Sequence, residues 1–229
     1  MSATSTIEWT QATWNPTTGC TQLSEGCRNC YAAKMAGRLK AMGTKRYAGG
    51  FELTLHEDLL DLPKHWAKPR TIFVNSMSDL FHKAVPLDFI RRVFATMEAC
   101  PRHQFQVLTK RSERLLELAP QLPWPKNVWM GVTVEEAKHA SRIDDLRHVP
   151  AAVRFLSCEP LLAPLGELDL NNIHWLIAGG ESGPGARPMD AAWGRSLRDQ
   201  CQAPGTAFLF KQWGGVRNKA AGRTLDGCE

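Results

Sequence analysis

Three cysteines lie close together near the start of the chain, in the stretch GCTQLSEGCRNCY at 19–31. Six residues separate Cys20 from Cys27, and two more separate Cys27 from Cys30. Thiolates are ligands for soft and borderline metals such as iron and zinc. A structural zinc site usually takes four ligands, often as two close pairs. Here the chain offers three thiols with no fourth nearby, so the first question is which metal, if any, this stretch holds.

Three local thiols fit a [4Fe–4S] cluster in which one iron stays open for another ligand. Radical S-adenosylmethionine (SAM) enzymes use such a cluster with the spacing CxxxCxxC, whereas this chain has a longer first gap, Cx6CxxC. The other four cysteines are scattered and include no second CxxC pair. The spacing therefore leaves three interpretations open: an iron–sulfur cluster, a zinc ion with a remote fourth ligand, and no metal.

The composition is that of an ordinary globular protein with a mildly basic balance. The formal net charge is +5, which permits an anionic partner such as nucleic acid without requiring one. No apolar run is long enough to span a membrane, and the first residues, MSATSTIEWTQ, lack the regions of a secretory signal. We therefore expect a cytoplasmic protein without membrane contact. Its seven cysteines are an odd number and argue against a disulfide framework.

Apolar runs that are typical of buried strands alternate with helical patterns along the chain. The predicted strands lie at 6–14, 70–76, 103–109, 127–133, 152–158, 173–180 and 206–212. The predicted helices lie roughly at 28–42, 86–99, 111–119, 135–147 and 190–203. Such alternation indicates βαβ units. We predict an α/β fold, a partial or irregular (β/α) TIM-type barrel of parallel strands, as a single domain over 1–229.

Polar residues follow most of these strands directly. In a parallel (β/α) sheet, such positions meet at the carboxyl edge, where ligands bind. We predict that this edge binds SAM through Asn75, Ser76, Ser78, Asp79, Lys110, Glu135, Glu181 and Lys211. The alternative is that these residues cap helices or are solvated at strand ends.

Two neighbouring residues at the end of the strand at 152–158 are candidates for catalysis. Cys158 is either a small core residue or a hydrogen-atom donor in radical chemistry. Glu159 precedes a proline, and a buried carboxylate there needs a partner. We expect that partner to be Arg154, Lys110 or a ligand.

Several further stretches resemble one family along nearly the whole chain. They are IEWTQATWNPTTGCTQLSEGCRNCYA, IFVNSMSDLFH, FQVLTKR, VWMGVTVE, RFLSCEPLL, GGESGPGARPM and FLFKQWG. The chain resembles a phage-associated, three-cysteine family of uncharacterised proteins related to the radical SAM superfamily. The resemblance implies an incomplete TIM-type barrel with the cluster loop after the first strand, and a distant similarity to spore photoproduct lyase.

Two functions follow from these patterns. The first is a radical SAM-type iron–sulfur enzyme that modifies or repairs nucleic acid in a phage or mobile-element context. It would bind a [4Fe–4S] cluster through Cys20, Cys27 and Cys30, use SAM, and need a reductant such as flavodoxin or ferredoxin. The second is a non-catalytic, zinc-binding module that contacts nucleic acid or protein.

Overall fold

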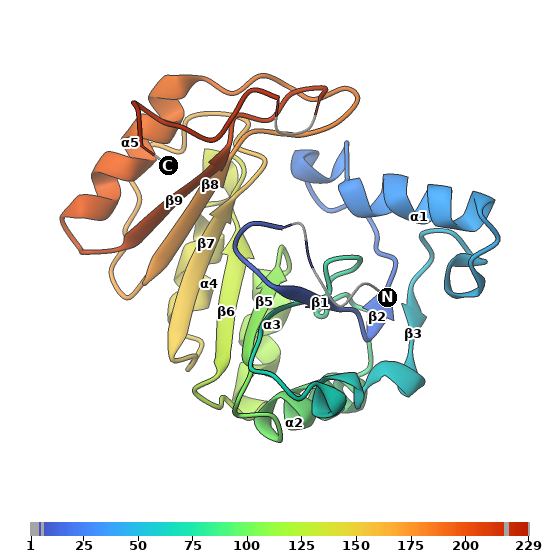
Figure 1. The fold of residues 1–229 in the computed structure, drawn as a ribbon. Coiled ribbons are helices and arrows are strands. Elements are labelled where there is room, and N and C mark those ends of the chain that lie inside the picture. Colours follow the sequence, from blue (N-terminus) through green and yellow to red (C-terminus); the bar gives the residue numbers. More distant parts are fainter. Residues whose placement is uncertain (1–4, 6, 218–219, 229) are drawn as a thin grey trace.

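The computed structural model describes residues 5, 7–217 and 220–228, and its centre is one curled sheet of seven parallel strands (Figure 1). The strand order is β1-β4-β5-β6-β7-β8-β9. The strands are β1 (Ala12–Trp14), β4 (Thr71–Val74), β5 (Gln104–Thr109), β6 (Val128–Thr133), β7 (Val153–Cys158), β8 (Trp175–Gly179) and β9 (Ala207–Gln212). Because neighbours in the sheet follow one another along the chain, the sheet curls in one direction as a partial barrel.

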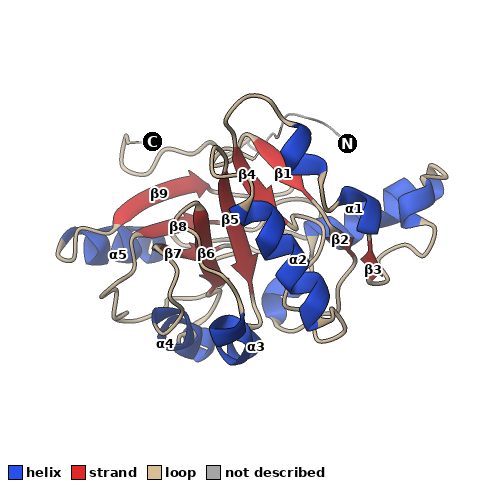
Figure 2. Cartoon of the chain, turned by 90° about the horizontal axis from the view of Figure 1, so that it is seen from below, coloured by secondary structure: helices blue, strands red, loops and turns tan. Residues whose placement is uncertain are grey.

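In the part of the chain that the structure describes, five α-helices connect and flank the strands (Figure 2). They are α1 (Tyr31–Ala41), α2 (Leu87–Glu98), α3 (Ser112–Leu118), α4 (Ser141–Arg147) and α5 (Ala191–Gln202). Six short 3-10 helices complete the helical structure: Glu25–Cys27, Lys45–Tyr47, Glu57–Leu59, Leu62–His65, Ala119–Gln121 and Ala137–His139. Two short strands, β2 (Thr17–Thr18) and β3 (Thr54–Leu55), pair antiparallel beside the main sheet.

The main hydrophobic core lies between one face of the sheet and the helices. Val107 in β5, Met130 in β6 and Leu156 in β7 are fully buried there. Helix α2 contributes an apolar stripe that includes Phe94 and Met97, both fully buried. The spacing of these helix residues matches one face of an α-helix, which explains why the sequence pattern located α2 so closely.

The opposite face of the sheet carries aromatic rings near the amino ends of the strands. Phe155 and Trp175 have ring centroids 5.5 Å apart, and Trp9 lies 4.6 Å from Phe73. Gly131 in β6 makes this arrangement possible, because a Cβ atom there would lie 2.5 Å from the Phe155 ring. The rings therefore cover the concave face near the amino ends of the strands.

The α/β partial barrel of parallel strands is therefore confirmed, with six of the seven strands within two residues of the predicted bounds. The helix predicted at 135–147 is shorter: a 3-10 turn covers Ala137–His139, and α4 begins at Ser141. The reason is that Glu135 turns into the molecule, where it is fully buried. Within the described residues, no helix has the length and hydrophobicity needed to cross a membrane.

Candidate functional site

The cysteine-bearing segment, residues 19–30, follows β2 and lies along the carboxyl edge of the sheet; we call it the cysteine loop. Its first residue is fixed by backbone bonds, since the Gly19 N–H donates to the Met77 carbonyl at 2.9 Å. Gly19 has φ +84°, and a Cβ atom there would lie 2.1 Å from the Glu52 carbonyl oxygen. Only glycine fits this close approach, so the sequence itself determines where the loop starts.

All three thiols of the cysteine loop are free and partly exposed. The Cys27 N–H donates to the Ser24 carbonyl at 2.9 Å, and the Cys30 N–H donates to the Cys27 carbonyl at 3.2 Å. Burial, together with the nearby Asp79 carboxylate, raises the pKa of Cys20 to about 11. Metal binding would therefore release a proton from Cys20, because the thiolate is the ligand.

The donors of the loop fit an iron–sulfur cluster in kind and in number, because three reduced thiols belong to one short segment. In the described part of the chain, no group of three or more His, Cys, Asp or Glu side chains is close enough to hold a metal ion. The loop would thus have to draw its thiols together on binding, and the assignment of Cys20, Cys27 and Cys30 as ligands stays a prediction.

The residues after β4 mainly hold the segment that leads into the cysteine loop. Asn75 adopts φ 61°, and its Nδ2 donates to Thr17 Oγ1 at 3.0 Å. Ser78 Oγ donates to the Thr17 carbonyl at 2.8 Å. Ser76 Oγ donates to Asn15 Oδ1 at 3.3 Å and stays half-buried. The three predicted SAM contacts in this stretch thus lie at the expected edge, where Asn75 and Ser78 bind the protein itself.

Asp79 ties the ends of β4 and β5 together. Its Oδ1 accepts from the Thr109 hydroxyl at 2.7 Å and from the Phe81 N–H at 3.0 Å. Its Oδ2 accepts from the Lys110 N–H at 3.2 Å and lies 3.6 Å from Arg111 Nη1. A carboxylate has about four acceptor positions, so the protein's own donors occupy Asp79. The Lys110 ammonium, in contrast, has no hydrogen bond or ion pair to the residues that the structure describes.

Glu135 connects the end of β6 to the cysteine loop. It is fully buried, and its two oxygens accept from the Ser24 hydroxyl and from Arg142 Nη1, the latter at 2.8 Å. Burial raises the pKa of Glu135, but nearby Lys110 and these two donors outweigh it and leave the pKa below its ordinary value. The carboxylate therefore stays ionised and holds the middle of the loop.

Glu181, after β8, holds the far end of the same loop. Arg187 donates to both of its oxygens, with Nη2–Oε1 at 2.7 Å and Nε–Oε2 at 2.9 Å, and Asn29 Nδ2 donates to Oε2 at 3.0 Å. Burial opposes ionisation, yet these hydrogen bonds lower the pKa of Glu181 to about 2. Arg187 also donates to the Glu25 carbonyl at 2.9 Å, so the glycine-rich turn and the cysteine loop form one unit.

Glu159, after β7, pairs with Lys211 in β9. Lys211 Nζ lies 2.6 and 2.8 Å from the two carboxylate oxygens, and Gln212 Nε2 donates to Oε1 at 3.2 Å. The expectation that Arg154 or Lys110 pairs with Glu159 is wrong. The Arg154 guanidinium instead donates to backbone carbonyls, including that of Ala151 at 2.8 Å.

Cys158 lies apart from the other predicted residues. It pairs in register with Ala178, whose neighbour in β9 is Phe210, and all three belong to the hydrophobic core against the helices. Its thiol has no exposed surface, and burial strongly raises its pKa. This placement agrees with a small core residue, and the hydrogen-donor role of Cys158 stays a prediction.

The partners that fix the cysteine loop were missed from the sequence. Ser24, Asn29 and Arg142 gave no recognisable local pattern, because two of their contacts join residues more than a hundred positions apart. The one available signal was Asn29, a polar side chain between two cysteines of a predicted metal loop.

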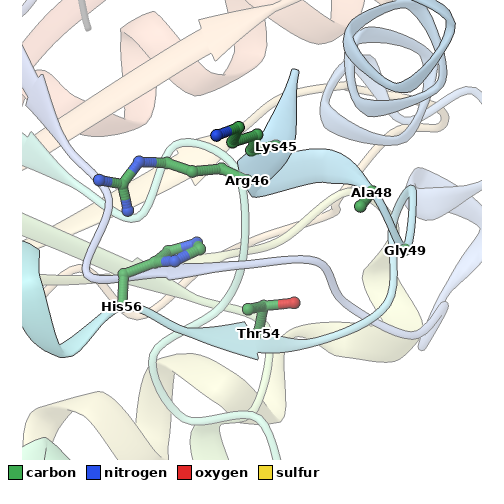
Figure 3. Close-up of a pocket in the computed structure, with 6 residues that line it drawn as sticks. All are labelled: Lys45, Arg46, Ala48, Gly49, Thr54 and His56. Carbon is green, nitrogen blue, oxygen red and sulfur yellow. The ribbon is translucent and has the colours of Figure 1, made fainter. Parts of the chain in front are cut away.

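A cavity of about 560 Å³ lies beside β3 rather than at the carboxyl edge. Its lining comes from the 3-10 helix Lys45–Tyr47 and from β3, and consists of Lys45, Arg46, Ala48, Gly49, Thr54 and His56 (Figure 3). Burial lowers the pKa of His56, whose Nε2 is 2.8 Å from Thr18 Oγ1. Lys45 and Arg46 are the two cationic side chains of this lining.

The fold and the site define a class: an α/β partial-barrel protein with a three-thiol loop held along the carboxyl edge of its sheet. The chain belongs to the family described as "Protein of unknown function (DUF5131)", whose model matches residues 4–229. No curated protein matches the sequence.

Among solved structures, the chain is similar to two of spore photoproduct lyase. One is complexed with dinucleoside spore photoproduct, with 12% identity and a TM-score of 0.43, covering 83% of this chain and 60% of that one. The other is a double mutant with bound AdoMet and dinucleoside spore photoproduct, with 12% identity and a TM-score of 0.44, covering 84% and 60%. The chain thus spans about 60% of the length of the lyase chains that it matches.

Proposed function

We propose that the chain is a radical SAM-type iron–sulfur enzyme that modifies or repairs nucleic acid, in a phage or mobile-element context. One observation carries this proposal: three free thiols lie on one loop, and buried strand-end carboxylates, Glu135 and Glu181, hold that loop along the edge of a partial parallel barrel. Ligand sites of such sheets form at this edge.

Three cysteines and one lysine of the chain would bind the cluster and SAM. Cys20, Cys27 and Cys30 would hold the cluster. When bound and reduced by a partner such as flavodoxin or ferredoxin, the cluster would supply the electron that cleaves SAM. The Lys110 ammonium is half-exposed at the same edge and would bind the SAM carboxylate by charge-assisted hydrogen bonds.

Aromatic rings line the concave face of the sheet near the amino ends of its strands. They are the rings of Phe155, Trp175 and Trp129, with centroids 5.5 and 6.2 Å apart between neighbours. A substrate that enters from the carboxyl edge would therefore meet an aromatic floor, formed by buried Phe155 and half-buried Trp129 and Trp175.

Anaerobic reconstitution with iron and sulfide, followed by incubation with SAM and a reductant, tests this proposal. We expect about four irons per chain, the broad absorption of an iron–sulfur cluster, and conversion of SAM to 5′-deoxyadenosine and methionine. Cys27→Ala should lose both the iron and the cleavage. Cys201→Ala is the matched control, because Cys201 is a buried core thiol in α5 and should keep both.

Two results would contradict the proposal. A colourless protein that binds one zinc per chain would indicate the non-catalytic module instead. A fully loaded, reduced cluster that leaves SAM intact, with and without nucleic acid present, would refute the enzyme activity while keeping the metal site.

A further inference from the structure

The positive charge of the chain is concentrated directly after the first half of the cysteine loop. Between Glu25 and Glu52 there is no acidic residue, whereas this segment contains six basic ones: Arg28, Lys34, Arg38, Lys40, Lys45 and Arg46. The chain has 28 Lys and Arg in total, and the remaining 22 are balanced by 23 Asp and Glu. The net charge of +5 therefore arises from this one segment.

The segment forms helix α1 and the 3-10 helix Lys45–Tyr47, which stand to one side of the sheet in Figure 1. Four of its cations, Arg28, Arg38, Lys40 and Lys45, are exposed, and none of them forms an ion pair with the residues that the structure describes. Most other surface arginines do have carboxylate partners, such as Arg195 with Asp226 at 2.8 Å. We call these four residues, with Lys34 and Arg46, the basic surface.

Two members of the basic surface are fixed in place by the protein. Lys34 Nζ donates to the Pro184 carbonyl at 2.7 Å, which joins α1 to the glycine-rich turn at the carboxyl edge. Arg46 pairs with Asp58, with Nη1–Oδ1 at 3.1 Å. The basic surface therefore extends from the carboxyl edge to the cavity beside β3, where Lys45 and Arg46 line one side (Figure 3).

An exposed aromatic ring accompanies these cations. Tyr31 is 63% exposed and lies seven positions before Arg38 on α1, so both side chains project from the same side of the helix. The only other tyrosine of the chain, Tyr47, is close enough that Tyr31, after burial, contributes to its raised pKa. Unpaired cations with an exposed aromatic ring are the features with which proteins bind single-stranded nucleic acid.

An anionic membrane is the competing partner for a basic helix, but α1 lacks the apolar face that membrane insertion needs. Its apolar side, Ala32 and Ala36, is buried in a small cluster with Met77. The large side chains that α1 leaves exposed are Tyr31, Arg38 and Lys40, and Met42 after its end is a single exposed apolar side chain rather than an apolar face. The charge and the ring therefore favour a polyanion with stacking bases over a lipid surface.

We propose that the basic surface binds the phosphate backbone of a single-stranded nucleic acid, with Tyr31 stacking on a base, and guides the strand to the carboxyl edge. This inference rests on the proposed function and names the face through which the substrate is held. DNA and RNA share the phosphate and base chemistry, and the measurement below separates them.

Equilibrium binding of the full, reconstituted chain to labelled 20-mers of single-stranded DNA, single-stranded RNA and duplex DNA tests the inference. Binding is measured without SAM or reductant, so that its outcome does not depend on catalysis. The double variant Arg38→Glu/Lys45→Glu should weaken single-strand binding by at least about tenfold. It should also reduce the slope of log K against log salt concentration by roughly 0.7 for each phosphate that the variant no longer neutralises.

The matched control is Lys68→Glu/Lys126→Glu. It changes the net charge equally, at exposed lysines before β4 and β6 and so near the opposite, amino edge of the sheet. This control should change binding by less than about threefold. Tyr31→Ala should weaken single-strand binding about tenfold while leaving duplex binding nearly unchanged, because paired bases are not free to stack.

Equal weakening in both charge variants would overturn the inference, since it would show a general charge effect. Binding to vesicles with anionic lipid but not to any of the nucleic acids would overturn it in favour of a membrane. If the basic surface binds nucleic acid as expected but SAM is never cleaved, this inference stands and the proposed enzyme activity fails.

Discussion

The hydroxyl of Ser24 donates to the buried carboxylate of Glu135, 111 residues further along the chain. This contact joins the middle of the cysteine loop to the end of β6. On its other side, Glu135 accepts from Arg142 at 2.8 Å, so one carboxylate links the loop, the sheet and α4. The conformation of the cysteine loop thus depends on an ionised group in the protein core.

Replacement of this carboxylate should lower stability. Glu135→Gln keeps the shape but leaves the Arg142 guanidinium, 8% exposed, without its counter-charge. We expect the free energy of unfolding to fall by roughly 1.5–3 kcal/mol, as measured by urea denaturation. Glu136→Gln is the control, because Glu136 pairs with the exposed Lys138 and should change stability by less than about 1 kcal/mol. Equal losses in the two variants would contradict the role of Glu135.

The space at Gly26 leads to a second prediction. A Cβ atom at Gly26 would lie 2.7 Å from Glu135 Oε1, so Gly26→Ala should push the loop away from the carboxylate and reduce the iron bound on reconstitution. Gly37→Ala is the control, since no atom lies within 4 Å of a Cβ there and Gly37 is inside α1. That substitution should stabilise the chain by about 0.5–1 kcal/mol and keep the iron. Normal iron content in Gly26→Ala would refute the prediction.

The stability of the metal-free, reduced chain should depend on pH through Glu181. Its pKa in the folded chain is about 2, below the ordinary 4.5, despite burial, because Arg187 and Asn29 donate to it. The unfolded chain therefore takes up the proton first, and the contribution of Glu181, at most about 3 kcal/mol, is lost as pH falls from about 5 to about 2. Urea unfolding at several pH values should show a flatter acid limb for Glu181→Gln.

A second carboxylate with a low pKa provides the control for this measurement. Hydrogen bonds from Arg195 and Arg198 lower the pKa of Asp226 to about 2, but Asp226 is exposed. Salt at about 1 M screens exposed pairs strongly. The difference between wild type and Asp226→Asn should thus shrink in high salt, whereas the difference for Glu181→Gln should persist. The reverse pattern would show that the ion pair of Glu181 is not shielded from salt, as its burial in the structure indicates that it should be.

The sheet was predictable from the sequence because its inner strands β5 to β8 are mostly buried and read as apolar runs. Even the edge strand β9 (Ala207–Gln212) begins one residue after the predicted start. The edge at which the polar residues gather followed from the topology alone, since residues after parallel strands share one end of the sheet. Lys110 and Glu181 do lie at that shared end, after β5 and β8.

The pairings at this edge were not predictable. Glu159 forms its ion pair with Lys211, although Arg154 is nearer in the sequence. Which cation reaches Glu159 depends on the face of the sheet that each residue occupies and on the irregular register between β8 and β9. The two-residue strands β2 and β3 are too short to give a periodic signal. Contacts of the cysteine loop join distant parts of the chain, for which a single sequence has no local pattern.

The Glu159–Lys211 pair allows a test of what holds the end of β7. Its side chains are only 19% and 17% exposed, so removal of one partner leaves a poorly solvated charge. Lys211→Met should therefore cost more stability than the double variant Glu159→Gln/Lys211→Met, with a coupling energy of roughly 1–3 kcal/mol. A thermodynamic cycle from urea denaturation measures it. Additive effects would show that the pair contributes no coupling.

Asp79 and Lys110 are neighbours at the carboxyl edge, yet the structure separates their roles. The oxygens of Asp79 already accept hydrogen bonds from the Thr109 hydroxyl and from two backbone N–H groups. They also form an ion pair with Arg111. The Lys110 ammonium has no partner of this kind among the described residues. Asp79→Asn should therefore lower the free energy of unfolding by roughly 1–3 kcal/mol and leave SAM affinity unchanged.

Lys110→Met should show the opposite behaviour. Loss of one charge-assisted hydrogen bond to the SAM carboxylate would cost roughly 1.5–3 kcal/mol, or about one to two orders of magnitude in affinity. The loss of stability should be smaller than for Asp79→Asn, because Lys110 acts on buried Glu135 through its charge alone, without a hydrogen bond. Equilibrium dialysis of SAM with the reconstituted variants, together with urea denaturation, measures both quantities. Weaker SAM binding in Asp79→Asn but not in Lys110→Met would reverse the two roles and return Asp79 to the cofactor contact that its place after β4 first indicated.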